Sequence, residues 1–389
     1  MKQKLKSELQ IVEDIFDLDN LQKLNINGLN LDKNKYLSDL IDEFHALINL
    51  TRLELNNNKI TNLSENVFEG LANLNYLSLE NNQISVINSD IFNGLNNLTV
   101  LILKHNRISY IESNALTGLK KLKGLYLGNN RLNEIDSWFF HGLSDLIELD
   151  LEFNKIVEIK TDTFQQMHRL EQLSLRHNEI NKLNTSLFKN LVSLEWLSLE
   201  KNNIIKINAN TFENLISLKT LNLAYNKISF IDEQAFIGLK SLKEFHINNN
   251  RINELSSFRQ LNCLKELFLG RNQISCISSN VFAILISLEK LDLSANEIKS
   301  IEANAFNGLV NLKKLRLEEN KIRELNDNAF FGLQSLRTLH LEGNQLSNLE
   351  RNSLSNLERL QKLYLGSNEI NQIDYDVFAN FVNLEVMYN

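Results

Sequence analysis

The sequence predicts a single solenoid, in which short repeats stack on one another and share one continuous core. Three observations predict it. Leucines recur with a period of 24 residues, an asparagine holds one fixed place in every complete repeat, and a phenylalanine recurs in the second half of most repeats. A chain of 389 residues would otherwise suggest two or three domains, but internal repetition overrides a length-based estimate.

The leucine register runs from Leu50 to the end of the chain. Successive repeats start 24 residues apart, except for one step of 22 after Leu242. Fourteen repeats are complete and a fifteenth stops at Asn389, inside a strand, so we expect the sequence to be incomplete at this end. The repeats start at Leu50, Leu74, Leu98, Leu122, Leu146, Leu170, Leu194, Leu218, Leu242, Leu264, Leu288, Leu312, Leu336, Leu360 and Leu384.

Residues 74–97 illustrate one repeat. Its first part, Leu74-x-x-Leu77-x-Leu79, alternates with period 2 and predicts a short strand. Because side chains alternate across a strand, the leucines point inward while the intervening residues point outward. Later in the repeat, Phe92 is expected to pack from the outer side.

The ninth position is asparagine in all fourteen complete repeats. The chain leaves the strand here, and buried backbone groups in that turn need hydrogen-bond partners. A carboxamide offers both donors and an acceptor, so stacked asparagines are expected to form a structural ladder from turn to turn. The ladder comprises Asn58, Asn82, Asn106, Asn130, Asn154, Asn178, Asn202, Asn226, Asn250, Asn272, Asn296, Asn320, Asn344 and Asn368.

The recurring phenylalanines are interpreted as a core spine rather than a cofactor-binding stripe, because they keep the repeat period. Leucine takes this place at Leu116 and Leu354. The phenylalanines at this position include Phe68, Phe92, Phe140, Phe164, Phe188, Phe212, Phe236, Phe282, Phe306, Phe330 and Phe378.

The motif LxxLxLxxNxIxxIxxxxFxxLxx over residues 50–389 resembles the 24-residue "typical" class of the leucine-rich-repeat superfamily, which includes Toll-like receptor ectodomains, Slit, chaoptin and the acid-labile subunit. The resemblance implies an α/β-type solenoid: a curved leucine-rich-repeat horseshoe with a parallel β-sheet on the concave face and irregular or short helical convex segments. It says much less about the ligand.

Three segments depart from the pattern. Residues 1–20 carry apolar residues at helical spacing and are expected to form a capping helix, followed by a degenerate first repeat over residues 21–49. The repeat at 242–263 is two residues short on its outer side. We expect a local change of curvature there, and interpret the deletion as drift of one repeat in preference to a purposeful hinge.

The sequence predicts no enzyme. His105, His177, His246 and His340 lie in different repeats, and Cys263 and Cys276 have no histidine at metal-ligand spacing. No phosphate-binding loop, HExxH or GxSxG motif occurs. We therefore expect no catalytic residue, no cofactor and no metal, and interpret both cysteines as structural thiols.

The concave face, at positions 2, 3, 5, 7 and 8 of each repeat, is the candidate binding surface. Aromatic residues stand out among mostly polar ones, and interfaces favour such residues at their centre, although scattered surface aromatics are also common. An acidic excess in the fifth to seventh repeats would attract a positively charged partner. The alternative is a solvated surface on which positive and negative charges are distributed at random. The candidate ligand-binding residues are Tyr126, Glu148, Asp150, Glu152, Phe153, Trp196, Tyr225 and Phe268, with Trp196 foremost.

The predicted function is non-catalytic recognition of a protein ligand on the concave face, in an extracellular receptor or a secreted protein. The alternative is an intracellular scaffold or adaptor in signalling. The net charge of −7 argues against generic nucleic-acid binding.

The sequence is compatible with two cellular locations. The family resemblance favours an extracellular or membrane-tethered protein, whereas a true start at Met1 favours the cytoplasm, because no signal peptide or apolar run of membrane-spanning length occurs. Three glycosylation sequons, at Asn62, Asn97 and Asn184, are compatible with secretion but no more numerous than chance would give.

Overall fold

The computed structural model describes residues 21–27, 47–255, 258, 260–374, 376–379 and 381–388. Contacts between Cα atoms divide the chain into two compact units. The first comprises residues 1–180 and 186–194, and the second comprises residues 181–185 and 195–389. We call them the N-terminal unit and the C-terminal unit.

The N-terminal unit is built on a parallel main sheet, with one strand from each repeat. Paired strands keep strict register, so that Leu24 lies opposite Leu53 and Leu77 opposite Leu101. In sheet order the strands are β1 (Lys23–Asn25), β2 (Arg52–Glu54), β3 (Tyr76–Ser78), β5 (Val100–Ile102), β7 (Gly124–Tyr126), β9 (Glu148–Asp150) and β11 (Gln172–Ser174).

The C-terminal unit repeats this design. In sheet order its main-sheet strands are β12 (Trp196–Ser198), β14 (Thr220–Asn222), β16 (Glu244–His246), β17 (Glu266–Phe268), β19 (Lys290–Asp292), β21 (Lys314–Arg316), β22 (Thr338–His340), β24 (Lys362–Tyr364) and β26 (Val386–Tyr388).

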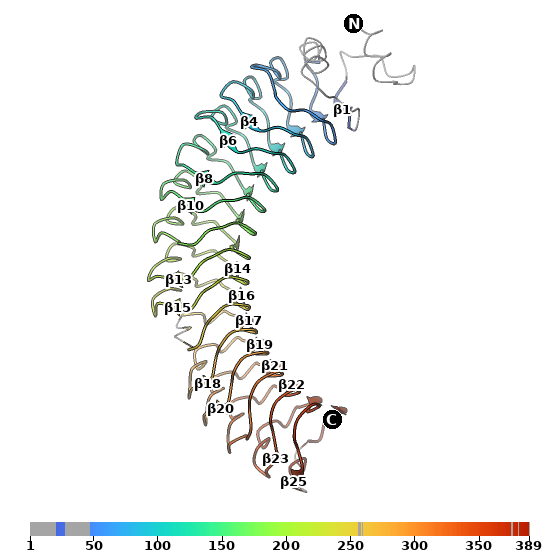
Figure 1. Ribbon diagram of the computed structural model, residues 1–389, viewed down its shortest axis with the longest axis vertical. Coiled ribbons are helices and arrows are strands. Elements are labelled where there is room, and N and C mark those ends of the chain that lie inside the picture. The colour runs from blue at the N-terminus through green and yellow to red at the C-terminus, as the bar shows by residue number, and fades with distance from the viewer. Residues whose placement is uncertain are drawn as a thin grey trace, which may run out of the picture. The chain divides into compact units, whose positions relative to one another are not determined.

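Short two-stranded sheets form the outer side of the repeats. The N-terminal unit has β4 (Val86–Ile87) with β6 (Tyr110–Ile111), and β8 (Glu134–Ile135) with β10 (Glu158–Ile159). The C-terminal unit has β13 (Lys206–Ile207) with β15 (Phe230–Ile231), β18 (Cys276–Ile277) with β20 (Ser300–Ile301), and β23 (Asn348–Leu349) with β25 (Gln372–Ile373). Within each unit the main-sheet strands lie along one side of the ribbon and the short outer strands along the opposite side (Figure 1).

The core lies between these two layers. Leucines at the first, fourth and sixth positions are fully or almost fully buried, as at Leu312, Leu315 and Leu317. Phenylalanines stack behind them at the repeat spacing: the rings of Phe282 and Phe306 lie 6.2 Å apart, and those of Phe306 and Phe330 5.9 Å. A repeat of 24 residues cannot bury its own apolar side chains, so these side chains are buried against the apolar side chains of the neighbouring repeats.

The ninth-position asparagines connect neighbouring repeats through their side chains. Asn154 Nδ2 donates to the carbonyl of Leu127 in the preceding repeat at 3.0 Å and to that of Leu151 in its own repeat at 3.1 Å. Its Oδ1 accepts from the backbone N–H of Leu132 at 3.0 Å. The same pattern recurs along both units, for example at Asn106 and Asn296.

The short repeat keeps the spine intact. Phe258 is buried, and its ring stacks 6.5 Å from Phe236 and 6.1 Å from Phe282. Strands β16 and β17 remain in register across the deletion, with Phe245 opposite Leu267. The two missing residues therefore leave both the sheet and the phenylalanine row continuous.

The predicted parallel-sheet solenoid is confirmed, with one difference on the outer side. The described residues contain no helix, and the expected short helical segments are turns and two-residue strands. No helix in that part of the chain has the length and apolar character needed to cross a membrane. The expected capping helix over residues 1–20 lies outside the described residues, as do residues 28–46 of the expected first repeat, while Lys23–Asn25 of that repeat forms β1.

Candidate functional site

The candidate surface is the outward face of the main sheet, which we call the sheet face. Its side chains come from positions 2, 3, 5, 7 and 8 of each repeat, since the leucines between them point into the core. Strict register places residues at the same position of neighbouring repeats side by side, about 4.8 Å apart. Side chains on this face can therefore contact both residues of their own repeat and residues of neighbouring repeats.

In the N-terminal unit, predicted residues form one connected cluster. Tyr126 Oη donates to Glu148 Oε2 at 2.6 Å. Lys104 Nζ lies 2.5 Å from Asp150 Oδ2 and 3.9 Å from Glu152 Oε1. Asp150 is 7% exposed, so this carboxylate is neutralised within the face and is less available to a partner than its position on a strand suggests.

Two glycines make room for these contacts. A Cβ atom on Gly124 would lie 2.9 Å from a ring carbon of Tyr126, so the ring lies flat over its own strand. A Cβ atom on Gly128 would lie 3.2 Å from Asp150 Oδ2. Because Gly128 has no side chain, Lys104 reaches across an entire repeat to Asp150.

Both cationic and phenolic members of this cluster have shifted pKa values. Burial alone lowers the pKa of Lys104, but the hydrogen bond and charge of Asp150 outweigh it and raise that pKa above its ordinary value. Burial and the hydrogen bond to Glu148 raise the pKa of Tyr126. Both groups therefore keep their protons well into the alkaline range.

Phe153 lies in the turn beyond β9, beside this cluster. Its ring stacks on His177 of the next repeat with centroids 4.3 Å apart, and the Arg176 guanidinium lies 5.3 Å from the Phe153 centroid. Phe153 and His177 both have left-handed backbones, with φ of 51° and 54°. This conformation is unfavourable for residues with a Cβ, and here it presents two rings at the edge of the sheet face.

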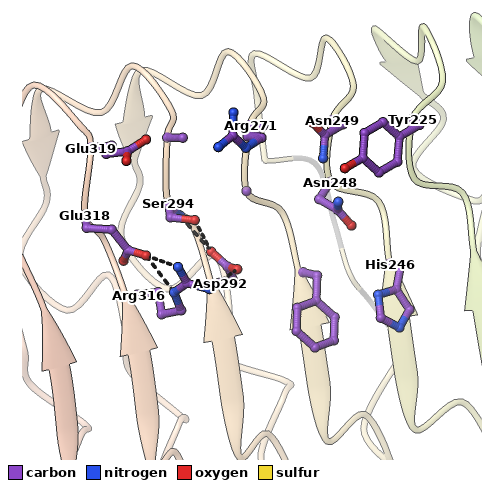
Figure 2. A pocket seen from close by; sticks show the side chains of 13 residues that line it. Tyr225, His246, Asn248, Asn249, Arg271, Asp292, Ser294, Arg316, Glu318 and Glu319 are labelled. Atoms are coloured by element: carbon purple, nitrogen blue, oxygen red, sulfur yellow. Dashed lines mark hydrogen bonds and ion pairs between the residues drawn. The ribbon is translucent and has the colours of Figure 1, made fainter.

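In the C-terminal unit, two predicted aromatics line one pocket on the sheet face. Tyr225 and Phe268 lie at its aromatic end with His246, which stacks on Phe268 at 4.4 Å between ring centroids. Asp292 and Arg316 lie at its charged end, where Arg316 Nη1 donates to Asp292 Oδ2 at 3.3 Å. The pocket has a volume of about 330 Å³. Figure 2 shows Tyr225 and His246 on one side of it and Asp292 and Arg316 on the other.

Glycine and small side chains open this pocket. A Cβ atom on Gly270 would lie 3.0 Å from Ser294 Oγ, and Ser294 itself bonds Asp292 Oδ1 at 2.6 Å. Tyr225 is 48% exposed, so its ring is the accessible part of the rim. Trp196, in β12 of the same unit, is half-buried and does not line the pocket.

The repeat motif matches the leucine-rich-repeat family model in nine overlapping segments that together run from residue 25 to residue 388, with a gap only at 253. The chain is a leucine-rich-repeat protein. No curated protein sequence matches it.

Solved leucine-rich-repeat structures share the fold. A leucine-rich-repeat protein of Leptospira interrogans is 26% identical, with a TM-score of 0.73 over 98% of both chains. The APL1 leucine-rich-repeat domain is 22% identical, with a TM-score of 0.68 over 82% of this chain and 80% of its own. A chain of the LRIM1/APL1C complex is 23% identical, with a TM-score of 0.69 over 82% of this chain and 56% of its own.

Sequence reasoning on this leucine-rich-repeat protein missed the residues that act across repeats. Lys104, Arg316 and His246 were not among the candidates, although each contacts one that was or lines a pocket with it. The sequence did contain a sign of these contacts, because glycine replaces the long side chains of other repeats at Gly128, where Lys104 crosses, and at Gly270, beside the pocket.

Proposed function

We propose that this leucine-rich-repeat protein is a non-catalytic recognition module that binds a protein ligand on its sheet face, as part of an extracellular receptor or secreted recognition protein. The observation that carries the proposal is the pocket of the C-terminal unit, where Tyr225, His246 and Phe268 adjoin Asp292 and Arg316. An aromatic floor beside a charged rim suits one amphipathic side chain of a protein partner, since interface centres favour aromatic and arginine anchors.

The distribution of reactive side chains supports a non-catalytic role. The sheet-face histidines at 177, 246 and 340 each stack on an aromatic ring of a neighbouring repeat. Such stacks make the imidazole rings part of an aromatic contact surface, which is the use that a recognition module has for them.

The fold of the solved relatives supports a protein as the ligand class. Structures of similar fold include the LRIM1/APL1C complex and the Toll–Spatzle complex, the latter with a TM-score of 0.55 over 95% of this chain. Those proteins assemble with protein partners, which motivates the same expectation here.

Substitutions on and off the sheet face test the proposal. Partner proteins should be identified by cross-linking to the wild-type chain in its native extract, and their affinity then measured with purified components. We expect Phe268→Ala, Tyr225→Ala and Trp196→Ala each to weaken binding tenfold or more, which corresponds to about 1.4 kcal/mol. The melting temperature of the exposed variant Tyr225→Ala should stay unchanged.

Phe230→Ala is the matched control, because Phe230 is a comparably exposed aromatic, 55% exposed, on the outer strand β15 of the same unit. It should bind like the wild type. Equal losses for Phe230→Ala and Phe268→Ala would place the binding surface elsewhere.

The extracellular part of the proposal has a separate readout. Glycans on Asn62 or Asn184, whose side chains are exposed, would be found by peptide mass spectrometry of the native protein. An unglycosylated native chain beginning at Met1 would favour the intracellular scaffold instead.

A further inference from the structure

Three potential metal ligands meet at the sheet face of the C-terminal unit. Glu318 lies two residues beyond β21, His340 is the last residue of β22, and Glu342 lies two residues beyond β22. One ligand atom from each residue lies within 4.8 Å of the other two. In the described part of the chain no other group of histidine, cysteine or acidic residues is arranged in this way.

Both carboxylates of this cluster are only half satisfied. Glu318 Oε1 accepts from Arg316 Nε at 2.6 Å, and His340 Nδ1 lies 3.0 Å from Glu342 Oε1. The second oxygen of each carboxylate, Oε2, is buried and has no hydrogen-bond partner. The Glu318 side chain is 8% exposed. Buried carboxylate oxygens normally have partners, so these two oxygens are placed to accept a ligand such as a cation.

We propose that Glu318, His340 and Glu342 form a binding site for a divalent transition-metal ion of the Zn²⁺ type. One imidazole nitrogen and two carboxylate oxygens are ligands that such ions accept. The carboxylates of Asp292, Glu318 and Glu342 (−3) together with the Arg316 guanidinium (+1) carry a net charge of −2, which balances a dication. Bonds of about 2.1 Å in tetrahedral geometry place ligand atoms roughly 3.4 Å apart. Side-chain rotations that shorten the separations between these atoms by up to about 1.4 Å therefore complete the site.

Neighbouring groups hold these ligands in place. The ring of His340 stacks on Tyr364 with centroids 4.3 Å apart. Arg316 fixes one oxygen of Glu318 and leaves the other for the ion, as outer-shell groups do at metal sites. The backbone is tied across the repeats, since Leu317 N donates to His340 O and Glu319 N to Glu342 O, both at 2.9 Å.

Three protein ligands leave one tetrahedral position open to a solvent or partner oxygen. Glu318 also lines the sheet-face pocket, so the ion would lie beside the surface proposed to bind protein. The metal site does not depend on that function, and its test needs no partner.

The chain supplies a matched control in a second histidine–carboxylate pair. His246 Nε2 lies 2.8 Å from Glu244 Oε1, and its ring stacks on Phe268 as His340 does on Tyr364. The residue that corresponds to Glu318 in the preceding repeat is Ala224, and the one that corresponds to Glu342 is Asn248. This pair therefore has the same kind of stack and one carboxylate partner, Glu244, but lacks the second carboxylate that Glu318 supplies next to His340.

Titration of tag-free protein with Co²⁺, followed by visible absorption and calorimetry, tests the site. We expect one ion per wild-type chain, with affinity at least tenfold weaker for His340→Ala and for Glu342→Gln. His246→Ala should bind Co²⁺ like the wild type. Absence of Co²⁺ binding by the wild type at millimolar metal, or equal binding by His340→Ala, would overturn the proposal.

Thermal unfolding with Zn²⁺ gives a second readout and controls for folding. Zn²⁺ should raise the melting temperature of the wild type and of His246→Ala, but not that of Glu342→Gln, because a ligand stabilises only the state that binds it. Without metal, Glu342→Gln should melt no lower than the wild type, since it removes charge repulsion at a side chain that is 35% exposed. An equal Zn²⁺ effect in both variants would mean that the ion binds elsewhere.

Discussion

Single side chains in this protein often serve two repeats at once. Asn154 satisfies the carbonyl of Leu127 in the preceding repeat and that of Leu151 in its own. Such carbonyls and amides in the turn have no strand partner, and burying each of them without a hydrogen bond would cost about 1–3 kcal/mol. The asparagine carboxamide supplies these hydrogen bonds in place of a neighbouring backbone.

Tyr126 also connects two repeats, because its hydroxyl donates to Glu148 of the next repeat. Its ionisation can be measured. Burial and the hydrogen bond to Glu148 raise its pKa, so the folded state holds the phenolic proton more tightly than the unfolded state, where tyrosine ionises near pH 10. Stability from this group is therefore fully present below about pH 10 and is lost as the pH rises through the folded pKa.

In the alkaline titration of tyrosinate absorbance, we expect one of the eight tyrosines to ionise later than the exposed ones. Tyr126→Phe should remove this late step, and Glu148→Gln should move it to lower pH because the acceptor charge is gone. A late step that persists in Tyr126→Phe would contradict the assignment.

At the scale of elements, the sequence predicts the features that every repeat shares and misses the contacts that occur in only one place. The strand positions, the inward leucines and the phenylalanine row follow from the 24-residue period, because each depends on contacts that every repeat makes in the same way. The reach of Lys104 over Gly128 to Asp150 depends on three successive repeats that differ from one another. No period encodes such a contact.

The left-handed turn at the eighth position was also hidden in the sequence. Asparagine at Asn57, Asn81 and Asn129 would have suggested it, but the same conformation is imposed on Phe153 and Tyr225. Residues that disfavour a positive φ adopt it here because the flanking strand and ladder asparagine fix the turn. The local propensity of one residue is thus overridden by the repeat.

The phenylalanine row permits a graded test of packing. Phe306 is fully buried between Phe282 and Phe330, so Phe306→Ala should lower the unfolding free energy by about 3–5 kcal/mol. Phe306→Leu should cost about 1 kcal/mol, because Leu116 and Leu354 fill this position in other repeats.

Urea unfolding followed by Trp196 fluorescence would measure both, in a Trp138→Phe background. The two tryptophans lie in different units, so Trp196 then reports on the C-terminal unit alone. Equal costs for alanine and leucine would mean that the ring's volume does not matter.

At the scale of the whole molecule, a uniform core supports a varied face. Leucines at the core positions recur almost without change, whereas sheet-face residues at the fifth position range from Tyr126 and Asp150 to Arg316 and His340. The period could therefore predict where a binding surface lies but not what it binds. Apart from Trp196, the candidates from the sequence lie in or beside two clusters, one in each compact unit.

Because the core of each repeat packs only against the repeats on either side of it, loss of stability should be greatest near the substituted repeat and fall off along the chain. In hydrogen exchange of Phe306→Ala, we expect faster exchange of main-sheet amides in β17, β19, β21 and β22, the strands of the repeats nearest to the cavity. The amides of β3, β5 and β7 in the N-terminal unit should exchange as in the wild type, since opening there does not expose the altered site. Phe306→Leu serves as the control, with little change anywhere. A uniform increase over both units would mean that the chain opens as one cooperative block, and nearest-neighbour stacking would then be the wrong description of its stability.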